Sequence, residues 1–280
     1  MKVKKIGIVS RLDHEGALEL TRSIIDKFSS VVEIAVSTNT AKELGIEDGS
    51  IEVESIENMR DKGVDFLIVV GGDGTVLLTL SKMHNPIPIL GINMGKVGFL
   101  VDTEAYEAIP NIEKALYGFT YNEQIRLSVS LNGEILPPAT NEIVLLTGRP
   151  AKILTSKVRI DEYELDELRS DGIVFSTPTG STAYAMSAGG PIIDPRVNAA
   201  LIVPLAPFKL SSRPWVVPAN CVINVETTIP EKEAILVIDG QHTYKVYEND
   251  IVTLTKATQP ARFVKSSIYR FYEKVQNKLC

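Results

Sequence analysis

The chain has 280 residues, with 29 Lys and Arg against 35 Asp and Glu, so its formal net charge is −6. This length is enough for two domains that each bury a core. The contents of hydrophobic residues (44%) and charged residues (23%) are ordinary for a soluble globular protein. No cluster of Lys and Arg stands out, which argues against a nucleic-acid partner. No apolar stretch approaches the roughly 18 to 20 residues of a membrane span, which argues against a membrane partner.

The cysteines and the N-terminus favour a cytoplasmic protein. Cys221 and Cys280 do not make a disulfide framework, and no zinc-ligand spacing occurs. The N-terminal stretch MKVKKIGIVSR runs directly into a short apolar strand, without the apolar segment of a signal peptide. We therefore expect a reducing, cytoplasmic location and no metal held by fixed protein ligands.

Strand and helix patterns alternate over roughly the first hundred residues. Asp65–Val70 (DFLIVV) is a near-continuous apolar run, which is typical of a central parallel strand. The alternation predicts a doubly wound α/β domain with a mostly parallel sheet. The predicted strands are Lys5–Val9, Val32–Val36, Asp65–Val70 and Ile87–Ile92, and the predicted helices are Glu15–Phe28, Val76–Met83 and Glu104–Leu116.

From about residue 120 onward, short β-rich runs separated by Gly, Pro, Asn and Asp replace this alternation. They predict an all-β second domain, and Ser267–Lys278 is predicted to be a closing helix. We expect residues 1–120 and 261–280 to form the α/β domain and residues 121–260 to form the β-rich domain. The predicted strands of the second domain are Arg126–Leu131, Glu142–Leu146, Ile153–Ile160, Ile173–Phe175, Ala200–Val203, Val222–Val225, Ala234–Ile238 and Ile251–Leu254.

The motif Gly71-Gly72-Asp73-Gly74-Thr75 follows the predicted central strand, at the end where open α/β sheets place their ligands. Its glycines allow positive φ and a close approach to phosphate, and Thr75 is a predicted N-cap for the next helix, whose amino terminus attracts anions. The spacing matches neither a Walker loop nor GxGxxG. Asp73 can accept the proton of a hydroxyl that attacks a phosphoryl group. A structural turn in which Asp73 satisfies local amides is the alternative.

Two further polar segments follow predicted strand ends. Gly91–Leu100 (GINMGKVGFL) indicates a second turn that approaches phosphate, or else an ordinary strand-to-helix connection. Asn141-Glu142 offers both donors and acceptors, which suits a sugar or a base edge. Read alone, that pair is more often a solvated turn.

The 22 residues Gly172–Ile193 contain no charge and are preceded by Asp171. Their centre, TPTGSTAY at 177–184, combines four hydroxyls with a ring that can stack on a base. This composition favours a ligand surface over a buried turn whose hydroxyls all find partners inside the protein. With the upstream glycine motif, it predicts a phosphorylating enzyme that acts on a large polar ligand.

Taken together, these motifs resemble those of the NAD kinase family. The chain carries GGDGT at 71–75, NxGxxGFL at 93–100, NE at 141–142, DG at 171–172 and TPTGSTAY at 177–184. The first motif is shared with diacylglycerol and sphingosine kinases, and the last three are more specific. The resemblance implies that the chain phosphorylates the 2′-hydroxyl of the adenosine ribose of NAD to NADP, with ATP and Mg²⁺. It also implies a C-terminal helix packed on the α/β domain and a homodimer or homotetramer.

The resemblance assigns roles to individual residues. Asp73 is expected to be the base, and Gly71, Gly72 and Thr75 to approach the donor phosphates. Asp171 is expected to reach the nicotinamide end of NAD, with a neighbouring subunit as its source. The residues expected to bind NAD are Gly74, Asn141, Glu142, Lys152, Arg169, Asp171, Thr182, Ala183, Tyr184, Ser187 and Gln241.

Two other functions compete with this interpretation. A lipid kinase of the same superfamily would leave TPTGSTAY unexplained, and a non-catalytic dinucleotide sensor would be expected to lack Asp73. The sequence leaves four properties open: ATP against inorganic polyphosphate as donor, acceptance of NADH, dimer against tetramer, and feedback by NADP or NADH.

Overall fold

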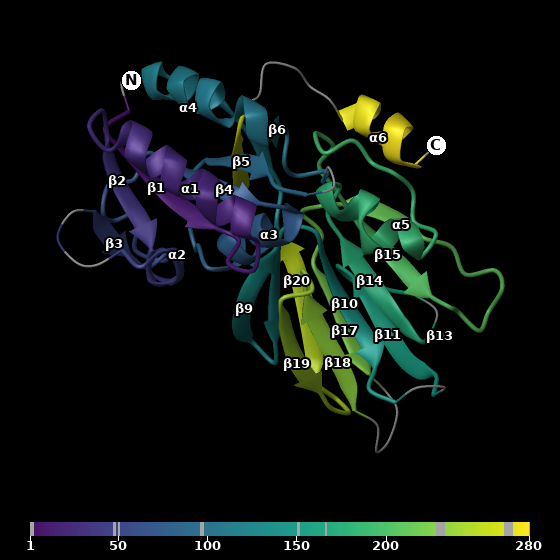
Figure 1. Ribbon diagram of the computed structural model, residues 1–280. Helices are drawn as coiled ribbons and strands as arrows, with labels where there is room; N and C mark the ends of the chain where they lie inside the picture. Colours follow the sequence, from purple (N-terminus) through teal and green to yellow (C-terminus); the bar gives the residue numbers. More distant parts are fainter. Residues whose placement is uncertain are drawn as a thin grey trace. The chain divides into compact units, whose positions relative to one another are not determined.

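A computed structural model describes residues 3–46, 49, 51–95, 98–149, 152–165, 167–227, 233–265 and 271–279. The chain divides into two compact units, one made of Met1–Glu123 with Ala261–Cys280 and the other of Gln124–Pro260 (Figure 1). Within the described residues, we find no helix that has both the length and the apolar character of a membrane span.

The first unit is an α/β domain, as predicted. Its sheet has the strand order β3-β2-β1-β4-β5-β21-β7, with β6 beside β5, and the pairs from β3 to β21 are parallel. The strands are β1 (Lys5–Ser10), β2 (Glu33–Ser37), β3 (Glu52–Glu54), β4 (Phe66–Gly71), β5 (Ile89–Asn93), β6 (Thr103–Glu104), β7 (Tyr121–Gln124) and β21 (Ala261–Val264).

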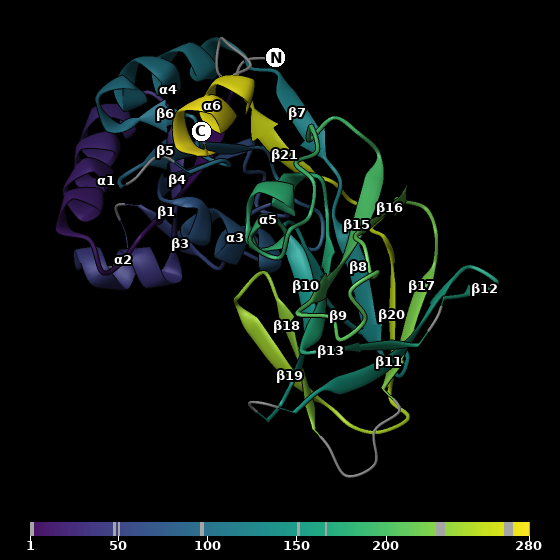
Figure 2. The ribbon, with the colours of Figure 1, turned by 90° about the vertical axis from the view of Figure 1, so that its right-hand side faces the viewer.

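Helices cover both faces of this sheet (Figure 2). On β4, Phe66 and Ile68 pack into the core that α1 and α4 share, whereas Leu67 and Val69 pack with residues of α3. Because both faces of β4 are buried, its sequence is apolar without alternation. The helices of this unit are α1 (Glu15–Phe28), α2 (Thr38–Leu44), α3 (Asp73–Ser81), α4 (Ala108–Tyr117) and α6 (Phe271–Leu279).

The helix predictions differ from the structure at several places, among them α3, which was predicted over Val76–Met83 and spans Asp73–Ser81. The helix α2 was not predicted, although Gly45 ends it in the left-handed region at φ +66. The predicted helix Glu104–Leu116 begins with a 3₁₀ turn, η1 (Ala105–Glu107), whose capping box joins Glu104 and Glu107. The predicted closing helix lies partly outside the described residues, and its described part begins at Phe271.

The second unit is a sandwich of two antiparallel sheets, which confirms the predicted β-rich domain. The strand orders are β16-β15-β14-β10-β18-β19 and β12-β11-β17-β20-β8-β9, and β13 pairs with β11. The elements are β8 (Leu127–Leu131), β9 (Glu134–Ala139), β10 (Glu142–Thr147), β11 (Leu154–Ile160), β12 (Tyr163–Glu164), β13 (Leu168–Ser170), β14 (Gly172–Ser176), η2 (Thr179–Thr182), α5 (Tyr184–Ser187), β15 (Ala199–Leu205), β16 (Trp215–Pro218), β17 (Ile223–Thr227), β18 (Ala234–Ile238), β19 (His242–Val246) and β20 (Ile251–Lys256).

The central strands of this sandwich bring distant polar residues together. Ile173 and Phe175 of β14 point into the core between the sheets, while Val174 packs against Ala185 of α5 on the other face. In the pairing register, Glu142 lies opposite Ser176, and its neighbour Ile143 lies opposite Ile238. The start of β10, the end of β14 and the end of β18 therefore meet at one end of the sheet.

Candidate active site

The GGDGT motif lies where β4 ends and α3 begins, but the helix starts earlier than the sequence suggested. Gly72 is the N-cap and Asp73 the first helical residue, so the prediction of Thr75 as N-cap was wrong. Asp73, Gly74 and Thr75 form the first turn, and Thr75 N–H already donates to Gly72 O at 3.0 Å. The amides of the first turn and the helix dipole favour a bound anion here.

The Asp73 carboxylate is fixed by the backbone of a second glycine segment. Its Oδ2 accepts from Phe99 N–H at 2.7 Å and its Oδ1 from Leu100 N–H at 3.1 Å. A Cβ on Gly98 would lie 1.8 Å from Asp73 Oδ1, so a side chain at Gly98 would displace the carboxylate. The structure thus joins the first two predicted motifs in one site, and Asp73 does satisfy local amides.

What distinguishes the glycines of GGDGT is the space around them, not an unusual backbone conformation. Gly71, Gly72 and Gly74 do not have the positive φ that the sequence suggested. A Cβ on Gly71 would lie 2.4 Å from Thr75 Oγ1, whereas a Cβ on Gly72 or Gly74 would have no described atom within 4 Å. Gly71 is therefore explained by the protein's own packing, and Gly74 is open on the surface.

In the second glycine segment, Gly91–Leu100, the side chain of Asn93 binds the backbone of the turn that follows it. Asn93 is 2% exposed, and its side chain accepts from Gly95 N–H at 3.2 Å and donates to Gly95 O at 3.1 Å. Lys96 and Val97 of this motif lie outside the described residues. The part of the motif that reaches Asp73 is the pair of amides at Phe99 and Leu100.

In the β-rich unit, Asp239 anchors the Asn141-Glu142 segment. Its Oδ1 accepts from the N–H groups of Asn141 (2.8 Å) and Glu142 (3.0 Å), and its Oδ2 accepts from Thr140 N–H (2.7 Å). Asp239 is 5% exposed and has the left-handed φ of +48. One buried carboxylate therefore fixes three successive amides at the start of β10.

The side chains of these three residues end in buried polar atoms. Among the described residues, Thr140 Oγ1, Asn141 Oδ1 and Glu142 Oε2 are buried and have no hydrogen-bond partner. Buried polar atoms in native proteins are almost always paired. Three such atoms on successive residues indicate a place where a ligand supplies the missing hydrogen bonds.

Burial perturbs the ionisable groups of this segment. Desolvation and the neighbouring Asp239 carboxylate raise the pKa of Glu142 to about 8, against the backbone N–H of Tyr184, which lowers it. Desolvation also raises the pKa of Asp239, opposed by its three amide donors and by Arg126. Arg126 is itself fully buried, and desolvation lowers its pKa to about 10. Ionisable groups shifted in this way are enriched at functional sites.

The hydroxyl-rich turn TPTGSTAY packs against the same segment, but its hydroxyls serve the fold. Thr177 Oγ1 donates to Thr140 O at 2.6 Å and accepts from Gly180 N–H at 3.1 Å. Ser181 Oγ donates to Pro178 O at 2.6 Å. Thr177 and Ser181 are therefore buried and bonded inside the protein, as in the alternative of a buried turn, whereas the prediction of a ligand surface over the rest of this segment stays a prediction.

The contact between this turn and Asn141 is close, and the residues after it reach the surface. A Cβ on Gly180 would lie 2.2 Å from Asn141 O, so only glycine fits there. Of the predicted NAD residues in this segment, Thr182 is 7% exposed and Tyr184 is 44% exposed. Ala183 is half-buried and Ser187 is exposed.

Three predicted site residues lie at the opposite end of the sheet. Gly172 at the start of β14 pairs with Leu146, whereas Ser176 at its end pairs with Glu142. Asp171 therefore lies roughly 20 Å along the chain from Thr177, at 3.3 Å per residue. Arg169 and Lys152 are near Asp171, because β13 pairs with β11 from Leu154 onward, and all three are exposed. Within one chain, these residues do not join Asn141 and Glu142.

Sequence reasoning missed Thr140 and Asp239 and favoured a neighbour. Gln241 is exposed in the turn that joins β18 to β19, and its N–H donates to Ile238 O at 2.8 Å. Asp239, two residues earlier, is the residue that contacts the Asn141 segment. The signal available for it was an acidic residue directly after an apolar run, which by itself is typical of an exposed turn.

The described residues do not form a metal cage. No group of three His, Cys, Asp or Glu side chains gathers among them in a way that would hold an ion. Both Asp73 oxygens already accept amide hydrogens. A divalent ion here would depend on ligands from a bound phosphate, which is how Mg²⁺ commonly binds.

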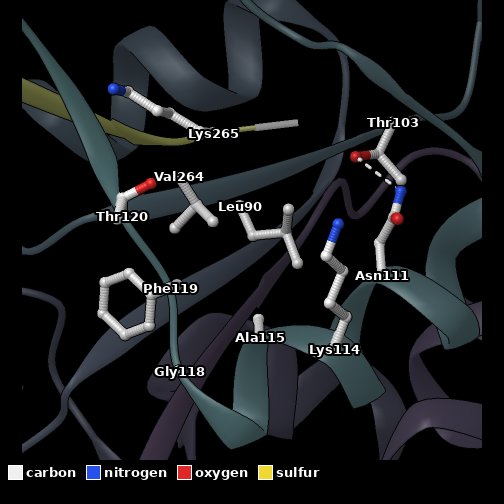
Figure 3. A pocket seen from close by; sticks show the side chains of 10 residues that line it. All are labelled: Leu90, Thr103, Asn111, Lys114, Ala115, Gly118, Phe119, Thr120, Val264 and Lys265. Atoms are coloured by element: carbon white, nitrogen blue, oxygen red, sulfur yellow. Dashed lines mark hydrogen bonds between the residues drawn. The ribbon is translucent and has the colours of Figure 1, made fainter. Parts of the chain in front are cut away.

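Each unit also has a pocket away from the predicted residues. In the α/β unit, a pocket of about 480 Å³ is lined by Leu90, Thr103, Asn111, Lys114, Ala115, Gly118, Phe119, Thr120, Val264 and Lys265. In Figure 3, the Lys114 side chain extends from α4 beside Leu90, whereas the Lys265 side chain points away from Leu90. A pocket of about 550 Å³ in the β-rich unit includes Trp215 and Arg213. None of the residues predicted to bind NAD or phosphate lines either pocket.

Comparisons with known proteins agree with the motifs. The family models described as ATP-NAD kinase N-terminal domain and ATP-NAD kinase C-terminal domain match residues 6–121 and 140–266. Proteins named NAD kinase from Methanosarcina mazei and Methanosarcina acetivorans are 56% and 54% identical over 279 residues. These matches cover 100% of this chain, 95% of the first relative and 100% of the second.

Two solved structures have the same fold. The yeast NADH kinase complexed with NADH has a TM-score of 0.90 at 23% identity and covers 100% of this chain and 88% of its own. An NAD kinase from Archaeoglobus fulgidus in complex with ATP has a TM-score of 0.78 at 29% identity and covers 98% of each chain. With both family models matched and relatives more than half identical over the full length, the chain belongs to the NAD kinase family.

Proposed function

We propose that this protein is an NAD kinase, which transfers a phosphoryl group from ATP to the 2′-hydroxyl of the adenosine ribose of NAD and forms NADP. The observation that carries the proposal is the set of buried side-chain atoms on Thr140, Asn141 and Glu142 that have no hydrogen-bond partner in the part of the chain that the structure describes. The hydroxyls of a ribose can donate to Asn141 Oδ1 and to Glu142 Oε2, and Thr140 can either donate or accept. A nucleoside therefore supplies the kind of hydrogen bonds that these atoms lack.

The chemistry is assigned to Asp73. A carboxylate has about four lone-pair sites, and two are occupied by the amides of Phe99 and Leu100. The remaining sites can accept the proton of the attacking hydroxyl while the amides hold the carboxylate in one orientation. Positioning and charge stabilisation contribute most to phosphoryl transfer. Gly71, Gly72 and Thr75 are the proposed contacts of the donor phosphates, and Gly74 is a proposed contact of NAD.

ATP is the proposed donor, with Mg²⁺ arriving on its phosphates. The Archaeoglobus fulgidus relative binds ATP according to its name, which supports the choice of donor. Inorganic polyphosphate stays an open second donor. NADH stays an open second acceptor, since the yeast relative is a kinase of NADH by name.

We also propose that Lys152, Arg169 and Asp171 contact the NAD of a neighbouring subunit in a homodimer or homotetramer. Their separation from Asn141 and Glu142 along β14 supports this assignment. Tyr184 and Ser187, which are exposed on α5, are the proposed contacts of the dinucleotide in their own subunit, with Thr182, Ala183 and Gln241 beside them. The cytoplasmic location stays a prediction, which cell fractionation would test.

The experiment is to measure NADP formation by the purified protein from NAD, ATP and Mg²⁺, with an NADP-specific dehydrogenase as detector. Asp73→Asn should lower kcat by at least roughly 100-fold, because a general base typically contributes about 10²- to 10⁴-fold. NAD affinity, measured by calorimetry, should be largely kept in this variant. Asn141→Ala should instead weaken NAD binding. Parallel reactions replace ATP with polyphosphate and NAD with NADH.

Each outcome has a distinct meaning. Turnover that is lost in Asp73→Asn supports both the kinase and its base, and an Asp73→Asn rate within a few-fold of the wild type would remove Asp73 as the base. No turnover despite NAD binding would favour a dinucleotide sensor. No NAD binding at all would favour a lipid kinase, to be tested with a diacylglycerol substrate.

A further inference from the structure

The C-terminal helix reaches the segment that holds Asp73. Lys274 of α6 is 9% exposed, and its Nζ donates to Phe99 O at 3.1 Å and to Val101 O at 3.2 Å. The same ammonium forms an ion pair with Asp102. A buried lysine is costly unless it is paired, and the partners of Lys274 among the described residues lie within residues 99–102.

Lys274 and Asp73 form hydrogen bonds to opposite sides of the peptide group that joins Phe99 and Leu100. The carbonyl of Phe99 and the N–H of Leu100 belong to the same planar peptide unit and point in opposite directions. Its carbonyl accepts from Lys274 Nζ, and its N–H donates to Asp73 Oδ1. The orientation of this plane fixes where the carboxylate can lie, and the plane is itself fixed by the ammonium.

The positive charge of Lys274 also strengthens the hydrogen bond that Leu100 N–H donates to Asp73. A cation on the carbonyl polarises the peptide group, and hydrogen bonds in such a chain strengthen one another. The N–H of Leu100 is then a better donor to the Asp73 carboxylate. The Phe271 ring of α6 also lies 6.5 Å from the Phe99 ring, centroid to centroid, so α6 contacts the segment through a side chain as well.

We propose that Lys274 is a positioning residue for Asp73, acting through the peptide group between Phe99 and Leu100. The inference rests on the proposed function, because it takes Asp73 as the base. Lys274 touches neither substrate nor donor in this proposal. It holds the backbone that orients the carboxylate, so the last helix of the chain contributes to phosphoryl transfer without entering the active site.

The experiment compares Lys274→Met, Lys274→Arg and Lys27→Met in the full-length protein. Met keeps most of the stem of Lys274 and removes its charge and donors. Lys27 is the matched control, since it pairs with Glu113 at 2.7 Å in the same unit and both side chains are about half exposed (47% and 48%). The readouts are kcat, the Kd of NAD by calorimetry, and hydrogen exchange of the Phe99 and Leu100 amides.

Lys274→Met should lower kcat roughly 10- to 100-fold, as expected when a catalytic group is slightly misplaced. The Kd of NAD should stay within about twofold, and the amides of Phe99 and Leu100 should exchange several-fold faster, because the peptide plane is released. Lys274→Arg should recover part of the rate, since its guanidinium can donate to both carbonyls. Lys27→Met should match the wild type in all three readouts.

A Lys274→Met protein with wild-type kcat, or with wild-type exchange at Phe99 and Leu100, would overturn the proposal. If Lys274→Met does not fold at the assay temperature, Lys274→Gln replaces it under the same criteria. If the wild-type protein shows no kinase activity, the proposed function fails by that result alone. The exchange rates of the Phe99 and Leu100 amides then still decide whether Lys274 fixes the backbone that binds the Asp73 carboxylate.

Discussion

At the scale of single residues, the candidate site contains buried polar groups whose hydrogen bonds the described residues do not all supply. The carboxylate of Asp239 accepts from three amides, while Glu142 beside it has a buried oxygen with no hydrogen-bond partner among the described residues. Ionising two neighbouring carboxylates together costs free energy, because their negative charges repel each other. Burial and this neighbour are the reasons why the pKa of Glu142 rises from 4.5 to about 8.

This shift predicts a pH dependence of stability in the absence of NAD. Between pH 4.5 and 8 the folded protein binds more protons at Glu142 than the unfolded chain does, so the free energy of unfolding falls as pH rises. The contribution is fully present below about pH 4.5 and is lost through about pH 8. Urea denaturation from pH 5 to 8.5 should show a steeper decline for the wild type than for Glu142→Gln.

The variant should keep a residual slope, because burial also raises the pKa of Asp239. Parallel stability curves for the wild type and Glu142→Gln would mean that Glu142 is ionised in the folded protein across this range. In that case its unpartnered oxygen would be solvated rather than held for a ligand.

At the scale of elements, the sequence predicted the strands and helices that carry the motifs, but not the contacts between them. The alternation of apolar runs identified β4, β10 and β14 to within one or two residues, because apolar periodicity is a local property. Asp73 meets Phe99 and Leu100 across 26 and 27 residues, and Asp239 meets Asn141 across 98. Contacts of this sequence separation depend on which strands pair and where the connecting loops lie, and the apolar pattern of one segment does not specify this.

The hydroxyl-rich turn shows how composition can mislead. Threonines and serines have the same signal whether they face a ligand or bond to their own backbone. In this turn Thr177 and Ser181 bond internally, and the exposed side chains are those of Tyr184 and Ser187 on the short helix α5, which are the proposed contacts of NAD. The exposed fraction of a side chain, rather than its type, separates the two roles.

This assignment predicts different effects for a substitution in that turn and for one in the short helix α5. Thr177→Val keeps the shape but leaves Thr140 O and Gly180 N–H without their partner, which should cost about 1 to 3 kcal/mol of unfolding free energy. Ser187→Ala, at an exposed position, should change stability by less than about 0.5 kcal/mol. Chemical denaturation measures both, and calorimetry with NAD should show weaker binding for Ser187→Ala.

A Thr177→Val protein as stable as the wild type would mean that the hydroxyl is not part of the turn's support. Equal NAD affinity of Ser187→Ala and the wild type would remove Ser187 from the proposed NAD contacts without affecting the role of Thr177.

At the scale of the whole molecule, the two ends of β14 pose a question that one chain does not answer. Asn141 and Glu142 lie at one end, and Asp171 with Arg169 at the other. If all of them serve NAD, each molecule of NAD must meet residues from two subunits. Closed symmetric oligomers allow this, because each subunit then gives its Asp171 to a neighbour and receives one in return.

This arrangement predicts complementation between two inactive proteins. Asp73→Asn keeps a normal Asp171, and Asp171→Asn keeps a normal Asp73. A mixed oligomer therefore contains sites that combine the intact Asp73 of one subunit with the intact Asp171 of the other. Coexpression of the two variants should give NAD kinase activity well above that of either variant alone, with oligomer size measured by light scattering.

Two matched controls define the meaning of the result. Coexpressing Asp73→Asn with Asn141→Ala tests residues that the proposal places in the same subunit, where the mixed oligomer retains no subunit with both groups intact. That pair should show no gain. Equal activity of both mixtures would show that Asp171 does not act across an interface, and a monomeric protein would exclude the sharing of sites altogether. Gain confined to the Asp171 pair would instead mean that the far end of β14 completes the site of the next subunit, which is why a single chain leaves it exposed.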